Sequence, residues 1–150
     1  AFWTDPDTQV DCRARFDYLP HPQPGRRPIL ADYKTTEDAN PTEFARSAAK
    51  WGYQMQADWY LRPARHLYDD EPAFVFVVQS KTPPYLVSVV QLGAEDLAYA
   101  HARNDMALRI FKECTDTGVW PGWGDNIHTL EMPTWWRIES DNLTERDPHD

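Results

Sequence analysis

Residues 29–36 place a carboxylate and an ammonium group directly after a short apolar run, Ile-Leu-Ala. Successive side chains of a strand point to opposite faces, so Asp32 and Lys34 share one face while Tyr33 points away. Metal-dependent phosphodiesterases need such a pair, because the carboxylate holds a divalent cation and the lysine positions or activates the attacking water. The alternative is that both residues lie on the polar face of an ordinary surface strand. Such a strand would not usually follow an apolar run.

Asp17 offers a second carboxylate, on a segment that alternates between apolar and polar residues over positions 10–19. This alternation predicts a strand with one polar face. The apolar face carries Cys12, Ala14, Phe16 and Tyr18, and the polar face carries Arg13, Arg15 and Asp17. A proline-rich turn follows at residues 20–25, so an antiparallel hairpin with residues 28–34 is the natural pairing. That hairpin would bring Asp17 within reach of the Asp32 strand, in a register that the sequence leaves open.

A helix is expected from Pro41 to about residue 61 or 68. Asn40 is a typical N-cap, proline is favoured at the first helical position, and Glu43 completes a start resembling a capping box. Apolar residues then recur at spacings of three and four, which predicts one buried face. That face consists of Phe44, Ala48, Trp51, Met55 and Trp59. Gln56 and Tyr60 are four residues apart and therefore neighbours on an adjoining face.

The residue pattern in the second half of the chain predicts another hairpin and another helix. Residues 73–79 and 86–92 are rich in β-branched side chains and flank turn residues at 81–84, which indicates two strands that are apolar on both faces. Residues 94–115 have an amphipathic helical pattern, and the chain after Gly118 is interpreted as irregular. The element order is β-β-α-β-β-α-tail. The predicted fold class is therefore α/β (mixed α+β), with a central mixed sheet flanked by helices.

Composition narrows the classes of function. The net charge of −9 counts against non-specific nucleic-acid binding, although residues 26–66 carry seven basic against five acidic side chains. No apolar run approaches the roughly 20 residues that cross a bilayer, and no signal peptide is recognisable. Cys12 and Cys114 are too few for an all-cysteine iron–sulfur cluster, and we expect two reduced thiols. The opening without an initiator methionine indicates a fragment or a processed product.

Taken in order, these motifs resemble the PD-(D/E)XK nuclease superfamily and, within it, the C-terminal nuclease domain of exonuclease VIII (RecE-type). The match covers the chain to about residue 136. The motifs that carry it are Arg15-Phe16-Asp17-Tyr18, Asp32-Tyr33-Lys34-Thr35-Thr36, Tyr53-x-x-Gln56-x-x-x-Tyr60, Phe74-Val75-Phe76-Val77, and Trp120-Pro121 followed by Leu130-x-x-Pro133-x-Trp135.

The resemblance implies a magnesium-dependent 5′-to-3′ exonuclease that degrades linear double-stranded DNA and leaves 3′ overhangs for a single-strand annealing protein of phage-type recombination. Mn²⁺ would substitute for Mg²⁺. The resemblance further implies a cytoplasmic, phage- or bacterium-encoded enzyme without membrane contact, and it leaves a homo-oligomer open.

Residue by residue, the same resemblance makes Asp17 and Asp32 metal ligands, together with the backbone carbonyl of Tyr33, and Lys34 the catalytic lysine. Gln56 and Tyr60 match the helical pair near the scissile phosphate. For Tyr60 the alternative is a structural role, with its hydroxyl anchoring the helix to the sheet.

The resemblance is incomplete at one point, because the family carries a further metal ligand, typically histidine, on a helix upstream of the first strand. We therefore interpret residues 1–136 as the nuclease domain without that helical segment and residues 137–150 as an acidic tail. The chain's histidines show no paired ligand spacing and are interpreted as non-ligands. They are His21, His66, His101, His128 and His149.

Two alternatives to the exonuclease remain open. The first is a catalytically silent nuclease-fold module that docks a partner protein, which the net charge and the absent upstream ligand favour. The second is another nuclease of the same fold, either an endonuclease or an enzyme acting on single strands.

Overall fold

The computed structural model describes residues 1–144, and the chain separates into two compact units, Ala1–Val119 and Trp120–Asp150. In the part of the chain that is described, no helix combines the length and apolar character that crossing a membrane requires. All of the site residues predicted from sequence belong to the first unit.

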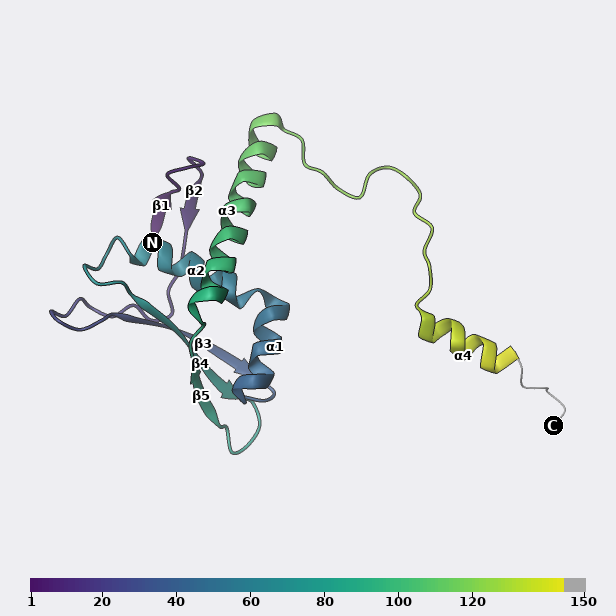
Figure 1. The fold of residues 1–150 in the computed structure, drawn as a ribbon, viewed down its shortest axis with the longest axis horizontal. Coiled ribbons are helices and arrows are strands. Elements are labelled where there is room, and N and C mark those ends of the chain that lie inside the picture. The colour runs from purple at the N-terminus through teal and green to yellow at the C-terminus, as the bar shows by residue number, and fades with distance from the viewer. Residues whose placement is uncertain (145–150) are drawn as a thin grey trace. The chain divides into compact units, whose positions relative to one another are not determined.

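A three-stranded sheet forms the centre of the first unit (Figure 1). Its order is β3 (Ile29–Thr36), β4 (Ala73–Ser80) and β5 (Val87–Val90). The first two strands are parallel and the last two antiparallel, so the sheet is mixed as predicted. The crossover between the parallel strands contains α1 (Pro41–Trp51) and α2 (Tyr53–Ala64), because parallel neighbours need a long connection.

The first predicted hairpin is wrong. β2 (Asp11–Arg13) pairs with β1 (Phe2–Thr4), a strand that the sequence did not indicate, in a separate two-stranded sheet. Segment 10–19 meets β3 at one bridge, where Tyr18 and Ala31 exchange backbone hydrogen bonds of 3.1 and 3.3 Å. The predicted alternation holds from Cys12 to Phe16 but not at Tyr18, which is 57% exposed, and alternation does not identify the strand that provides the partner.

The predicted single helix is in fact two. Asn40 caps α1 by accepting a hydrogen bond from the Thr42 amide at 2.9 Å, and Pro41 opens the helix as expected. Gly52 then adopts a left-handed conformation with φ of 70°, which ends α1 and starts α2 in a new direction. The residues of the predicted buried face therefore do not all point to the same side, and Trp51 is 64% exposed.

The hydrophobic core lies between one face of the sheet and the two crossover helices. Its aromatic centre is Phe76, whose ring lies 5.1 Å from that of Phe74 and 5.7 Å from that of Phe44 on α1. The other buried apolar members are Leu30, Ala39, Ala48, Ala57, Leu61, Ala64 and Val78. The opposite face of the sheet is more open: Val87 and Val89 of the edge strand β5 are exposed, so the prediction of two buried faces is wrong for that strand.

The C-terminal half contains α3 (Ala94–Thr117), which confirms the second predicted helix and ends at Gly118 in a left-handed conformation. The segment after it, interpreted as irregular, contains α4 (Thr134–Thr144). The predicted acidic tail, residues 137–150, thus begins inside a helix, and residues 145–150 lie outside the described part of the chain.

Candidate functional site

The strand β3 presents Asp32 and Lys34 on the same side, as the alternation predicted. Asp32 is 2% exposed, and the Lys34 ammonium lies 2.5 Å from its Oδ2 atom. Tyr33 points to the opposite face, where its hydroxyl donates a hydrogen bond to Gln79. Leu30, on the same face of the strand, is fully buried, and exposure rises from the buried Asp32 to the Lys34 side chain at 18%, so the pair sits where the buried face meets the outside of the domain.

Asp17 reaches this pair from the segment that precedes β3. Its Oδ2 atom accepts a hydrogen bond of 3.1 Å from the backbone N–H of Tyr33, the residue between Asp32 and Lys34. The bridge between Tyr18 and Ala31 holds the two segments together one residue away. Asp17 is therefore bonded to the residue between Asp32 and Lys34, and a single bridge rather than a hairpin brings it there.

Gln56 completes the cluster from α2. Its side-chain amide donates a hydrogen bond of 2.7 Å to Oδ1 of Asp32, across 24 residues of sequence. This contact fixes the carboxylate between Gln56 on one oxygen and Lys34 on the other. The crossover helices thus place a polar side chain over the strand that carries the acid and the lysine.

The surroundings of Asp32 shift the pKa of its carboxyl. Burial raises the pKa of its carboxyl above the ordinary value, and the negative charge of Asp17 raises it further, whereas Lys34 and Gln56 oppose this by stabilising the carboxylate. A cation placed between the two carboxylates would favour their charged forms. The donor set therefore fits a divalent metal, since Mg²⁺ commonly takes one or two protein carboxylates and completes its shell with water and phosphate oxygens.

Sequence reasoning missed the surroundings of Lys34. Its ammonium lies 4.7 Å from the centre of the Tyr53 ring and 5.8 Å from that of Phe76, within the range of cation–π attraction. Tyr53 precedes Gln56 by three residues, so the helical spacing already placed both side chains on one face of α2. This spacing is the feature of the sequence from which the position of Tyr53 beside Gln56 could have been predicted.

Tyr60 is not part of the hydrogen-bonded cluster. Its ring packs edge-on against Phe16 at 5.4 Å and Phe74 at 5.9 Å. Within residues 1–144, no hydrogen bond joins its hydroxyl to Asp32 or Gln56. The packing therefore favours a structural role in which the ring, rather than the hydroxyl, connects α2 to the sheet.

Other polar groups do not add a metal centre. No cluster of three or more His, Cys, Asp or Glu side chains suited to a metal occurs within the described residues. His101 instead contacts the buried Asp58 at 3.0 Å, and a ring nitrogen of His128 lies 2.8 Å from the Trp123 carbonyl. His149 lies outside the described part of the chain.

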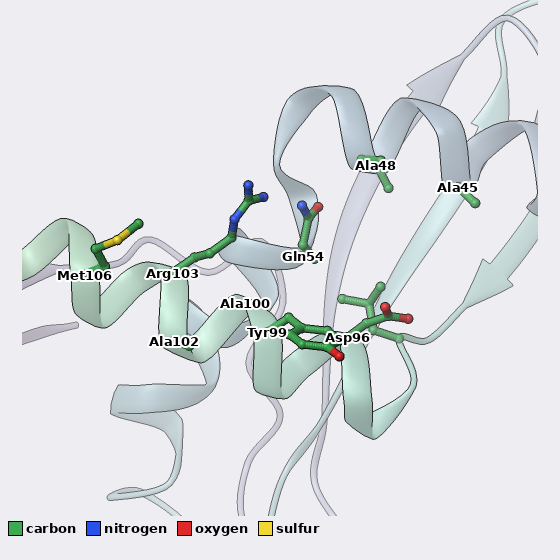
Figure 2. A pocket seen from close by; sticks show the side chains of 11 residues that line it. Ala45, Ala48, Gln54, Asp96, Tyr99, Ala100, Ala102, Arg103 and Met106 are labelled. Carbon is green, nitrogen blue, oxygen red and sulfur yellow. The ribbon is translucent and has the colours of Figure 1, made fainter.

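A groove of about 690 Å³ between α1 and α3 is separate from this cluster (Figure 2). Small residues form much of its lining, among them Ala45, Ala48 and Ala100, with Gln54 and Arg103 beside them. None of Asp17, Asp32, Lys34, Gln56 or Tyr60 lines it. The acid–lysine cluster, not this groove, is the candidate site, because only the cluster combines carboxylates, a cation and a half-buried amide.

A mixed sheet with a helical crossover, and an Asp-x-Lys strand joined by an upstream aspartate, define a PD-(D/E)XK nuclease-like domain. A family comparison agrees: the chain belongs to the family described as PDDEXK-like domain of unknown function (DUF3799), whose model matches residues 1–133. The resemblance to this superfamily found in the sequence is thereby confirmed, while the closer likeness to exonuclease VIII remains a proposal.

Among solved structures, the chain is similar to a crystal structure from Eubacterium rectale described as a "Putative exonuclease". The TM-score is 0.58 at 14% sequence identity, and the similarity covers 92% of this chain. The chain spans 55% of the length of that structure. At this identity the likeness supports the fold. No match was found among curated proteins.

Proposed function

We propose that this domain is a metal-dependent nuclease that hydrolyses the phosphodiester backbone of DNA at the Asp17–Asp32–Lys34–Gln56 cluster. The observation that carries the proposal is the arrangement around Asp32, a buried carboxylate held by Lys34 at 2.5 Å and Gln56 at 2.7 Å, with Asp17 next to it. A stability role alone does not explain it, because burying a carboxylate costs free energy that an apolar side chain would avoid.

Each residue of the cluster has a distinct task in this proposal. Asp17 and Asp32 would hold the metal, with the backbone carbonyl of Tyr33 as a further ligand. When bound, the cation would supply Lewis-acid polarisation of the scissile phosphate. Lys34 places positive charge where negative charge develops during cleavage, and the amide of Gln56 fixes the orientation of the Asp32 carboxylate.

The finer proposal follows the resemblance to exonuclease VIII. The domain would act with Mg²⁺, or Mn²⁺ in its place, on the ends of linear double-stranded DNA and proceed from 5′ to 3′. The resulting 3′ overhang would be taken by a single-strand annealing protein in the cytoplasm of the bacterial or phage-infected host. Because residues 1–16 contain no histidine that could match the family's upstream ligand, we also retain a silent docking module as the second candidate.

Digestion of linear and covalently closed circular duplexes carrying a label tests the function. We expect Mg²⁺-dependent loss of a label at the 5′ end of linear duplex before an internal label, with the circle left intact. Equal cleavage of the circle would replace the exonuclease by an endonuclease. Absence of cleavage by a folded chain that binds metal would favour the docking module.

Metal binding has a readout that does not require activity. A ligand that binds only the folded state stabilises it by about 2.7 kcal/mol at a concentration 100 times its dissociation constant. We therefore expect saturating Mn²⁺ to raise the melting temperature of the wild-type chain, and Asp17→Asn or Asp32→Asn to abolish most of this rise.

Asp70→Asn is the matched control for the metal prediction, because Asp70 is an exposed carboxylate in the loop after α2. Its variant should keep the full metal-dependent rise in melting temperature. An equal rise in the Asp32→Asn and wild-type chains would show that the cation binds elsewhere.

A further inference from the structure

An open groove of about 980 Å³ lies between the segment that leads to Asp17 and the helix α2, and its lining includes Phe16, the residue before Asp17. Its wall combines two guanidinium groups with aromatic rings, and we call it the arginine groove. The lining residues that matter are Arg13, Arg15, Phe16, Trp59 and Tyr60.

The two sides of the arginine groove come from the same two segments that carry Asp17 and Gln56 of the candidate site. On one side, Cys12 and Ala14 are buried while Arg13, Arg15 and Asp17 are exposed, so the alternating chain presents both arginines with Asp17. An alternating extended chain advances about 6.6 Å for every two residues. The arginines therefore form a row that begins next to Asp17 and leads away from it.

On the other side of the groove, α2 supplies Trp59 and Tyr60. Tyr60 follows Gln56 by four residues and thus lies one helical turn beyond the amide that holds Asp32. Trp59 is fixed by a hydrogen bond of 3.0 Å from its indole nitrogen to the Arg13 carbonyl, and its ring lies 5.2 Å from that of Trp3. The aromatic wall is therefore rigid and connected to the backbone of the arginine row.

The two arginines are available for a ligand. Within residues 1–144, no carboxylate forms an ion pair with Arg13 or Arg15. Arg62, by contrast, is ion-paired with Asp58 and Asp105. In a chain with a net charge of −9, two unpaired guanidinium groups in one groove favour an anionic ligand.

We propose that the arginine groove binds an unpaired DNA strand, with Arg13 and Arg15 contacting successive backbone phosphates of the strand that reaches Asp17 and Asp32. This inference rests on the proposed nuclease function and adds the form of substrate that reaches the site. Basic grooves lined by aromatic rings suit single strands, because the cations follow the backbone while bases or sugars pack on the rings. A duplex end would accordingly be opened before its strand reaches the two carboxylates.

The test is the affinity of a short fluorescent single-stranded oligonucleotide, measured by anisotropy in EDTA so that no cleavage occurs. For single strands, the logarithm of the association constant falls with the logarithm of salt concentration by about 0.7 for each neutralised phosphate. The double variant Arg13→Ala/Arg15→Ala should therefore lower the slope by about 1.4 and the affinity near 0.1 M salt by about 10- to 30-fold.

Two controls separate phosphate binding from loss of charge or fold. Arg46→Ala/Arg103→Ala removes the same charge from α1 and α3 and should leave slope and affinity unchanged. Arg13→Lys/Arg15→Lys keeps both charges and should restore most of the slope. All variants should stay close to the wild-type melting temperature, since Arg13 and Arg15 carry no ion pair among the described residues and Arg46 pairs only with the exposed Glu43.

Three results would overturn the inference. They are wild-type affinity in the double alanine variant, equal weakening by the Arg46 and Arg103 control, and a preference for duplex over single strand in competition. None of them decides the nuclease proposal, which is judged separately by cleavage of labelled linear duplex in Mg²⁺. Cleavage without such binding would reject the arginine groove alone.

Discussion

Lys34→Met is expected to lower the rate of Mg²⁺-dependent DNA cleavage by about 100- to 1,000-fold, the usual effect of losing one electrostatic donor to a transition state. Methionine keeps an unbranched apolar side chain over the Tyr53 ring and removes only the charge beside Asp32. Because the lysine acts on charge that develops during the reaction, binding of duplex in Ca²⁺ should change little. The measurements are the single-turnover cleavage rate and the affinity on one preparation.

Lys50→Met is the matched control for this prediction. Lys50 also lies over an aromatic ring, that of Trp51 at 5.0 Å, but it belongs to the last turn of α1 and has no contact with the acid cluster among the described residues. The control should cleave at the wild-type rate. A Lys34→Met protein that is folded, as judged by its thermal melt, and that cleaves like wild type would refute the assignment of the site.

Asp58→Ala should cause the largest loss of stability, about 3–5 kcal/mol, because it removes one partner from a buried charged network. Asp58 is 2% exposed and accepts hydrogen bonds from Arg62 at 2.9 Å and from Asn104 at 2.8 Å, while His101 lies 3.0 Å away. The network joins α2 to α3, so its loss leaves the Arg62 guanidinium with fewer partners beside the core. Urea unfolding monitored by circular dichroism measures the change.

An exposed ion pair provides the comparison. Asp116 pairs with Lys112 at 2.5 Å on the surface of α3, where both side chains are solvated. Asp116→Ala should therefore cost less than about 1 kcal/mol. If both variants lose the same stability, the buried network contributes no more than a surface pair, and the prediction for Asp58 fails.

The secondary structure of the first unit was largely predictable, because it depends on backbone periodicity and local sterics. An apolar run identified β3, β-branched residues identified β4, and spacings of three and four identified the helices. Gly52 was visible in the sequence, yet a glycine inside a helical pattern costs only about 1 kcal/mol and is often tolerated, so the break was not predicted. Because of that break Trp51 is exposed, and the side chains of α2 point in directions that one continuous helix would not give them.

Strand pairing was not predictable to the same degree. The segment around Asp17 carries a clear alternating pattern, but the pattern is equally compatible with β1 and with β3 as its partner. Competition among distant segments for backbone hydrogen bonds and burial decided the pairing. The predicted contact between Asp17 and the Asp32 strand nevertheless occurs, because Asp17 bonds the backbone of Tyr33 directly.

The sequence by itself determined that Asp32 and Lys34 share a face, since the alternation of a strand allows nothing else. It also determined the cap at Asn40 and the neighbouring positions of Gln56 and Tyr60. Only the tertiary structure decided that Gln56 holds Asp32 while Tyr60 packs between Phe16 and Phe74. The physical reason is that local periodicity sets the direction of a side chain, whereas its partner depends on how distant segments pack together.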